Sequence, residues 1–491
     1  SVDPTESQRV RFDGQWLDTP LFRRVDLPLG AVIPGPAIIS EPHCTTVVNP
    51  NWTATLLSQG ELLLESQARP SISHIVPTTT DTDIGPDPIQ LEIFNNHFAA
   101  IAKQMGITLQ NTSSSVNVRE RLDFSCAIFT SNGELVVNAP HIPVHLGAMG
   151  ETVRAIIAEQ LDDSEGIHAG DVFITNDPYR GGSHLPDITV VTPVFNHDEL
   201  LFFTASRAHH SEIGGIAPGS MPPFSTTLAE EGVLIRSFKL LTAGQSHEDK
   251  LLHILGDHPF PSRTPEVNLA DVRAQVAANQ QGVNDLQQLL DTTGQQQVLA
   301  YMQFIQSAAE LKTRQAIGAL ADGVYSHTDF LDEHAAGHHE AQIKATITVE
   351  GDNITFDFAG TSDVLPSNLN ANSAIVTAAV MYVMRCLING DIPLHAGVLK
   401  PVKILIPRCL LNPGDHENPQ QCPAIVGGNV ETSQRIVDVL IGALSLAAGS
   451  QGTMNNLLFG DDNFGYYETI CGGAGAIADT AGASAVHTHM T

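Results

Sequence analysis

Positively charged side chains are scarce in this 491-residue sequence. It holds 24 Lys and Arg against 54 Asp and Glu, so its formal charge is −30, and only 16% of its residues are charged. Duplex nucleic acid and anionic membranes both need a basic contact surface, so we expect neither as a partner. The usual charged fraction is about 25%, and the lower value here indicates that much of the chain is buried in a core or against a partner.

Cysteine is also scarce, and its six copies are scattered without a C-x-x-C pair. That distribution fits a reducing compartment better than a disulfide scaffold or a zinc ribbon, so we expect a cytoplasmic protein. No apolar run approaches the roughly 20 residues of a membrane span, and no signal peptide opens the chain. The chain starts at Ser1 and stops at Thr491 within a patterned stretch, so we expect it to be part of a longer protein.

Several signatures of nucleotide and acyl chemistry are missing. The glycine-rich stretch at 472–475 is not followed by Lys-Ser/Thr, which excludes a P-loop there, and it is not a dinucleotide fingerprint. No Gly-x-Ser-x-Gly elbow is present. We therefore expect that this chain does not contain a complete ATP-binding site.

The segments that are present predict a mixed α/β or α+β fold of several layers. Residues 1–68 have the pattern of short strands separated by Pro and Gly turns, and residues 69–88 are a linker candidate. Residues 89–491 then form the main domain.

A helix should begin at Pro88, because Asp87 suits an N-cap and proline suits the first helical position. Its apolar residues recur at steps of three and four from Leu91 to Met105, and Gly106 should close it. Further helices are expected within 264–325 and over 432–448. The expected strands are 25–30, 37–39, 45–48, 124–129, 187–195 and 200–205, with a hairpin around Gly351.

Histidines beside carboxylates are the strongest chemical signal. In His184-x-x-Asp187 a proline stiffens the loop, so an imidazole and a carboxylate can converge on one ion with little entropy to lose. If the strand after Asp187 pairs with the strand before His209, their ends bring His209 to the same place. Mixed His and carboxylate ligation suits a catalytic Mn²⁺, Fe²⁺, Zn²⁺ or Mg²⁺. The alternative is loop histidines that make ordinary hydrogen bonds.

Several separated motifs, in matching order, resemble those of the hydantoinase B/oxoprolinase family. The central motif is Asn-Asp-Pro-Tyr-Arg-Gly-Gly-Ser-His-Leu-Pro-Asp-Ile-Thr at 176–189, and others lie at 121–127, 141–147, 426–434 and 467–469. The resemblance covers about residue 86 to the end. It implies a hydantoinase B-like domain of several layers.

Residues 10–66 instead resemble the C-terminal tail of the hydantoinase A/oxoprolinase family, through the stretches 35–42 and 45–48 and Trp52. An A-type tail ahead of a B-type domain is similar to the single-chain 5-oxoprolinases, whereas hydantoinases and acetone carboxylases usually keep the two on separate chains. The resemblance therefore implies ATP-dependent opening of 5-oxo-L-proline, a small cyclic amide, to L-glutamate in glutathione metabolism.

The same resemblance implies cofactors and partners. ATP and Mg²⁺ would be bound by the hydantoinase A-like portion of the same full-length chain, together with a monovalent cation. Because a lactam is a poor electrophile, phosphorylating its oxygen supplies a leaving group, so this segment alone should be inactive. We also expect a homo-oligomer.

By resemblance to the acetone carboxylases, the B-type portion holds a divalent metal. The corresponding ligands here are Asp123, His184, Asp187 and His209. His210 and Glu212 are candidates for proton transfer beside it, and His145 is a candidate pocket histidine. For each of these three, hydrogen bonding around the metal is the alternative role.

Other functions remain open at this point. Within the same superfamily, the alternatives are an ATP-dependent N-methylhydantoin hydrolase and an acetone carboxylase-like subunit. From another class, the alternative is a non-catalytic scaffold or interaction subunit.

Overall fold

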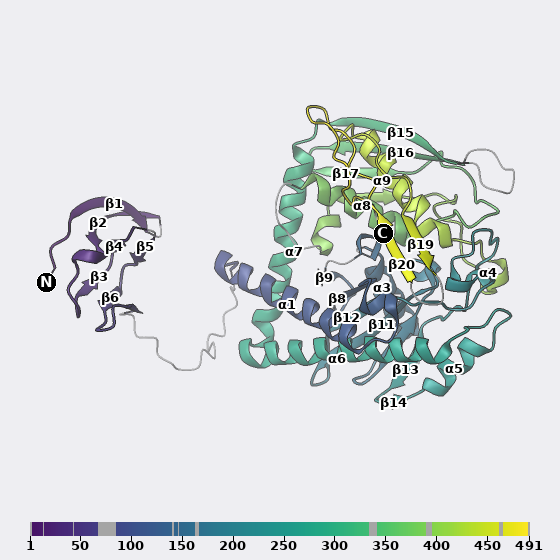
Figure 1. Ribbon diagram of the computed structural model, residues 1–491, viewed down its shortest axis with the longest axis horizontal. Coiled ribbons are helices and arrows are strands. Elements are labelled where there is room, and N and C mark those ends of the chain that lie inside the picture. The colour runs from purple at the N-terminus through teal and green to yellow at the C-terminus, as the bar shows by residue number, and fades with distance from the viewer. Residues whose placement is uncertain are drawn as a thin grey trace. The chain divides into compact units, whose positions relative to one another are not determined.

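The computed structural model describes residues 2–66 and 85–489, apart from 13, 43, 140–141, 146, 163–165, 333–340, 389–394 and 461–464. The chain divides into two compact units, Ser1–Asp83 and Ile84–Thr491. Both are drawn in Figure 1. Most of the linker expected at 69–88, namely residues 69–84, lies outside the described residues.

The smaller unit is built from short strands, as its sequence predicts. One sheet has the order β1 (Glu6–Phe12), β2 (Gln15–Arg23), β4 (Ala37–Ser40) and β5 (Thr45–Val48), and the other has β3 (Val32–Pro34), β6 (Trp52–Leu56) and β7 (Leu62–Ser66). The strand expected at 25–30 is wrong. Residues Arg24–Asp26 form a 3-10 turn, η1, because Pro28 and Gly30, at φ +82°, turn the chain there.

The larger unit is built around one seven-stranded sheet whose neighbouring strands are all antiparallel. Its spatial order is β14 (Gln245–Ser246), β13 (Phe238–Thr242), β10 (Val172–Thr175), β11 (Asp187–Asn196), β12 (Glu199–His209), β8 (Phe124–Thr130) and β9 (Leu135–Asn138). The predicted pairing of the strand after Asp187 with the strand before His209 is confirmed.

Helices cover both faces of this sheet. On one face lie α1 (Pro88–Thr112) and α6 (Pro265–Thr293), and on the other lies α3 (Ala148–Asp162). Figure 1 shows α6 running beneath the strands. Because both faces are covered, β8 is buried along nearly its whole length, and Cys126 within it is a fully buried core residue.

Helix α1 begins as predicted but ends later. Asp87 caps it, accepting a hydrogen bond from Ile89 N, and Phe94 and Met105 face the core. The expected end at Gly106 is wrong, because buried Leu109 continues the apolar stripe for another turn and Gly106 packs within it.

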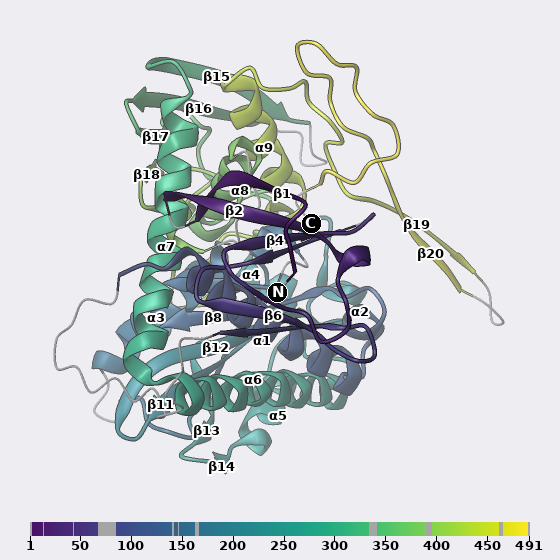
Figure 2. The same ribbon diagram turned by 90° about the vertical axis from the view of Figure 1, so that its left-hand side faces the viewer.

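A second layer packs around a four-stranded sheet. It contains β15 (Gly323–Leu331), β16 (Ala341–Glu350), β17 (Asn353–Asp357), β18 (Val402–Leu405), α7 (Gln295–Gly318), α8 (Ser373–Leu387) and α9 (Glu431–Ala443). The predicted hairpin around Gly351 is confirmed. Helix α7 extends from this layer to the level of α6 in both views (Figure 2).

The remaining elements of the larger unit are short. They are α2 (Val116–Arg119), α4 (Leu228–Glu231), α5 (Glu248–Gly256) and a hairpin of β19 (Asn455–Gly460) and β20 (Gly465–Ile470), which projects from the body in Figure 2. The predicted mixed α/β class is confirmed. Within the described part of the chain, none of the helices combines the length and apolar character that crossing a membrane requires.

Candidate metal centre

The ends of three neighbouring strands meet at one edge of the seven-stranded sheet. Strand β11 starts at Asp187 and β12 ends at His209, and the register places these two residues opposite each other. Asp123 directly precedes β8, and its carbonyl accepts a hydrogen bond of 2.9 Å from His209 N. Antiparallel pairing thus brings together residues that are 86 positions apart in the sequence, since 209 − 123 = 86.

His184 joins them from the loop ahead of β11. The turn is tight, with Asp187 N donating to His184 O at 3.0 Å. His184 Nε2 then lies 3.0 Å from Asp187 Oδ1 and 3.1 Å from His209 Nδ1, and His209 Nδ1 lies 2.9 Å from the same carboxylate oxygen. Three donor atoms therefore form a triangle with sides of 2.9–3.1 Å.

Protons alone cannot satisfy all three sides of this triangle. If both imidazoles donate to the carboxylate, their two N–H groups face each other. If one imidazole donates to the other, the accepting nitrogen turns its lone pair toward the carboxylate. One cation among the three lone pairs satisfies every side, and two ligands at right angles, each about 2.1 Å from a metal, lie about 3 Å apart. The donor set therefore fits a divalent metal, and these are the residues His184, Asp187 and His209.

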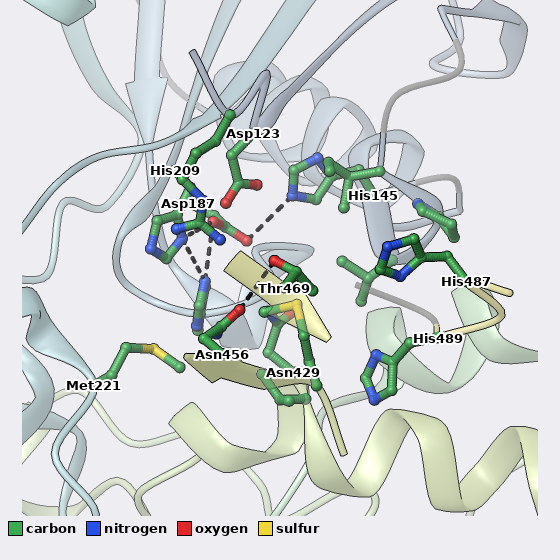
Figure 3. A pocket seen from close by; sticks show the side chains of 17 residues that line it. Asp123, His145, Asp187, His209, Met221, Asn429, Asn456, Thr469, His487 and His489 are labelled. Atoms are coloured by element: carbon green, nitrogen blue, oxygen red, sulfur yellow. Dashed lines mark hydrogen bonds and ion pairs between the residues drawn. The ribbon is translucent and has the colours of Figure 1, made fainter. Parts of the chain in front are cut away.

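The cluster forms one wall of a cavity of about 590 Å³ (Figure 3). Asp123 and His145 line the same cavity. His145 Nε2 lies 3.3 Å from Asp187 Oδ2, and its Nδ1 lies 3.0 Å from Ser125 Oγ. Because Nε2 faces a carboxylate, it carries the proton, and Nδ1 accepts from the serine hydroxyl.

Burial and charge set the protonation of the cluster. Burial favours a protonated Asp187, but the His184 charge and hydrogen bonds from the three histidines outweigh it and hold the pKa of Asp187 well below its usual value. Burial lowers the pKa of His184. Burial also opposes a charged His209, but the carboxylates of Asp123 and Asp187 prevail and raise its pKa. An ionised carboxylate beside a neutral imidazole is the state that binds metal ions.

His210 and Glu212 do not line the described cavity. His210 is buried against α6, where its Nε2 lies 3.1 Å from Gln275 Oε1 and its Nδ1 lies 3.2 Å from Asn268 Nδ2. Glu212 receives the backbone N–H groups of Arg263 and Thr264, each at 3.0 Å, just ahead of α6. Both residues hold α6 in place rather than facing the cavity.

The far wall of the cavity comes from segments to which the sequence assigned no role. Figure 3 labels Asn429, Asn456, Thr469, His487 and His489 around it. Burial lowers the pKa of His489 to about 4, so that this imidazole is neutral at pH 7. Two signals pointed to four of these residues, namely the family-like stretches at 426–434 and 467–469 and a pair of histidines two positions apart, whereas no signal pointed to Asn456.

Comparison with known proteins was made for both sequence and structure. A family model described as hydantoinase B/oxoprolinase matches residues 87–491. The chain is 44% identical over 508 residues to "5-oxoprolinase 1" of Arabidopsis thaliana, covering 98% of this chain and 38% of that protein. It is 41% identical over 505 residues to "5-oxoprolinase" of Saccharomyces cerevisiae, again covering 98% of this chain and 38% of the relative.

Two solved structures have a similar fold. An ATP-dependent caprolactamase from Pseudomonas jessenii has a TM-score of 0.71 at 26% identity, over 82% of this chain and 69% of that one. Nucleotide-free acetone carboxylase has a TM-score of 0.70 at 19% identity, over 82% of this chain and 56% of that one. The chain thus spans 38% of the length of the plant and yeast relatives.

Proposed function

Because this chain belongs to the hydantoinase B/oxoprolinase family, we propose that it is the hydantoinase B-type part of an ATP-dependent 5-oxoprolinase. The reaction is the opening of the lactam of 5-oxo-L-proline to L-glutamate, a step of glutathione metabolism. The observation that carries the proposal is the 44% identity to a 5-oxoprolinase over 98% of the chain. That match extends ahead of residue 87, where the family model begins.

The proposal divides the work between two portions of the full-length protein. Residues 1–68 are the tail of a hydantoinase A-like domain, 69–88 are the linker, and 89–491 are the hydantoinase B-like domain. ATP and Mg²⁺ belong to the A-like portion, which phosphorylates the lactam oxygen and so supplies a leaving group. Support comes from the sequence of residues 10–66 and from the relatives' greater length.

The proposed metal centre lies in the cavity of the larger unit. His184, Asp187 and His209 would hold the ion, with Asp123 as a further ligand from the start of β8. A divalent metal there polarises a carbonyl or activates water. The ion is Mn²⁺, Fe²⁺, Zn²⁺ or Mg²⁺, since these accept mixed imidazole and carboxylate ligands.

The chain's own side chains prepare this site. His145 Nε2 faces Asp187 Oδ2 at 3.3 Å, so that the other carboxylate oxygen is left to face His184 and His209. We propose this positioning role for His145 in place of direct proton transfer. Neutral side chains on the far wall, Asn429 and His489 among them, can hydrogen-bond the polar amide group of the lactam ring.

Substrate comparison in the full-length protein tests the proposal. With ATP and Mg²⁺ present, we expect glutamate to form from 5-oxo-L-proline, with no turnover of N-methylhydantoin or of acetone with bicarbonate. Turnover of either of the last two instead would assign the chain to a hydantoinase or an acetone carboxylase. If none of the three substrates reacts, the result favours the alternative of a non-catalytic scaffold or interaction subunit.

The proposal also includes a cytoplasmic location and a homo-oligomer. Scattered cysteines favour the former, and the family resemblance implies the latter. Analytical ultracentrifugation of the full-length protein should give a mass of at least two chains, and a monomer would contradict the second point.

A further inference from the structure

Arg207 is a fully buried charged residue that lies next to the proposed metal ligands. It precedes His209 by two positions on β12, so both side chains point to the same face of the sheet. The register pairs Arg207 with Thr189, and the adjacent row on that face pairs His209 with Asp187. The guanidinium therefore occupies the row directly behind the proposed ligands.

The guanidinium contacts four acceptors on separate parts of the chain, all of them neutral. Its Nε donates to Thr189 Oγ1 at 2.9 Å, and its Nη1 donates to Ser183 Oγ at 3.3 Å. Its Nη2 donates to Thr152 Oγ1 at 2.9 Å and to Gly181 O at 2.8 Å. Strand β12 is thereby connected to β11, to α3 and to the loop that carries His184.

The loop 181–184 packs closely against α3 and α8. Gly181 has φ +89°, and a Cβ there would lie 2.2 Å from Thr152 N. From the opposite side, Asn372 Nδ2 donates to Gly182 O at 3.0 Å and to Ser183 O at 3.2 Å. Arg207 and Asn372 thus hold the loop from both sides, directly before His184.

Packing alone does not explain a buried arginine. Removing a charge from water is unfavourable, and an apolar side chain of similar size fills the same volume without that cost. Arginine stays protonated in proteins, so the side chain offers all its donors at pH 7. What arginine adds over an apolar residue is a rigid fork of five donors.

We infer that Arg207 is a positioning residue of the proposed metal centre. It holds the loop 181–184 against β12, so that His184 Nε2 meets Asp187 and His209. This inference rests on the proposed metal site, and it adds a residue that touches neither the metal nor the substrate.

The experiment compares two variants at Arg207 with a matched control in the full-length protein. Arg207→Lys keeps the charge but loses the fork, and Arg207→Met keeps the volume but loses both. Asn279→Leu is the control, because Asn279 is equally buried and bonds Val190 O and Thr204 O of the same two strands from the α6 side. Zn²⁺ and Mn²⁺ affinity is measured by competition with a chelator, with His184→Ala as the baseline for other metal sites.

We expect both Arg207 variants to lose Zn²⁺ affinity by about tenfold or more. Hydrogen exchange of metal-free protein should also become faster across 181–187. Asn279→Leu should lower the melting temperature without changing either quantity. If the Arg207 variants do not fold, Ser183→Ala removes one of the four acceptors and should give a smaller loss in the same direction.

The outcomes distinguish a failure of the positioning role of Arg207 from a failure of the proposed metal centre. Unchanged affinity and unchanged exchange at 181–187 in a folded Arg207→Lys protein would overturn the positioning role. A wild-type protein that binds no more metal than His184→Ala would overturn the metal centre itself. If Asn279→Leu lost as much metal affinity as the Arg207 variants, Arg207 would contribute only to general stability. That result would contradict the inference.

Discussion

His209 and His210 are neighbours in the sequence, but they point to opposite sides of the sheet. Side chains alternate along a strand, so His209 faces Asp187 and the cavity while His210 faces α6. His210 has both ring nitrogens occupied, by Gln275 Oε1 and by Asn268 Nδ2. Its hydrogen bonds hold a helix on the sheet and leave no nitrogen for a substrate.

Exchanging these two histidines singly for alanine should therefore have different effects. His209→Ala should reduce bound metal from about one ion per chain to the His184→Ala baseline. His210→Ala should keep the metal but lower the unfolding free energy by roughly 1–3 kcal/mol, because it leaves buried partners unpaired. Elemental analysis after chelator-free purification measures the bound metal. Urea unfolding measures the change in stability. Metal loss in His210→Ala alone would contradict the site.

Glu231 is a buried carboxyl whose titration should be visible in stability. Burial raises its pKa to about 8 from a model-peptide value of 4.5, although Ser225 Oγ and the N–H groups of Ile425 and Val426 donate to it. The unfolded chain therefore releases this proton at lower pH than the folded chain. From about pH 4.5 to 8, stability should fall with rising pH by up to about 1.4 kcal/mol per unit, and above 8 this contribution becomes constant.

Glu231→Gln should remove this pH dependence, since glutamine imitates the protonated carboxyl. Urea unfolding at pH 5, 6, 7 and 8 would measure the slope in the wild type and in the variant. Identical slopes in the two proteins would show that Glu231 titrates with an ordinary pKa.

At the scale of elements, two glycines fix the wall of the cavity where η7 (Val426–Asn429) leads into α9. A Cβ on Gly428 would lie 2.0 Å from Asn370 O, and one on Gly427 would lie 2.9 Å from Leu369 Cδ2. Only glycine permits this approach of two backbones. The approach sets the position of Asn429, which lines the cavity.

Gly428→Ala should accordingly lower the unfolding free energy by roughly 1–3 kcal/mol or more, because the backbone must move. Gly449→Ala is the matched control, since a Cβ there meets no atom within 4 Å. Thermal unfolding of the two variants measures the difference. Equal melting temperatures would refute the close packing at η7.

Local patterns predicted the type and the beginning of elements better than their ends. The cap at Asp87 and the apolar stripe after it gave the start and the buried face of α1. Its end did not follow from Gly106, because packing of Leu109 in the core outweighs the low helix propensity of one glycine. Likewise, α9 stops at Ala443 although the expected helix ran to 448.

At the scale of the whole molecule, the described lining of the cavity lies entirely within the larger unit, between Arg121 and His489. The three residues proposed to hold the metal, His184, Asp187 and His209, therefore all come from the larger unit. Lactam hydrolysis does depend on the ATP-using portion in our proposal.

A chain of residues 85–491 should therefore bind one divalent ion per chain but should not form glutamate from 5-oxo-L-proline with ATP. The full-length protein should do both. Metal analysis and a glutamate assay measure these outcomes, with circular dichroism as the control for folding. Glutamate formation by the shorter chain would contradict the division of work between the two portions.

By itself, the sequence determined the mixed fold class, several strands of the central sheet, the start of α1 and the family. Apolar periodicity and caps are local, and the family motifs are contiguous, so both can be read along the chain. The motif 176–189 also carried two of the proposed ligands, His184 and Asp187.

Only the tertiary structure decided which side chains meet. Antiparallel register placed Asp187 opposite His209, strand alternation turned His210 toward α6, and the fold brought Asn429 and His489 to the far wall. It also buried Arg207 behind the site. The physical reason is that strand register, the neighbours on each face of a sheet and burial are set by contacts between residues distant in the sequence, and no local pattern contains them.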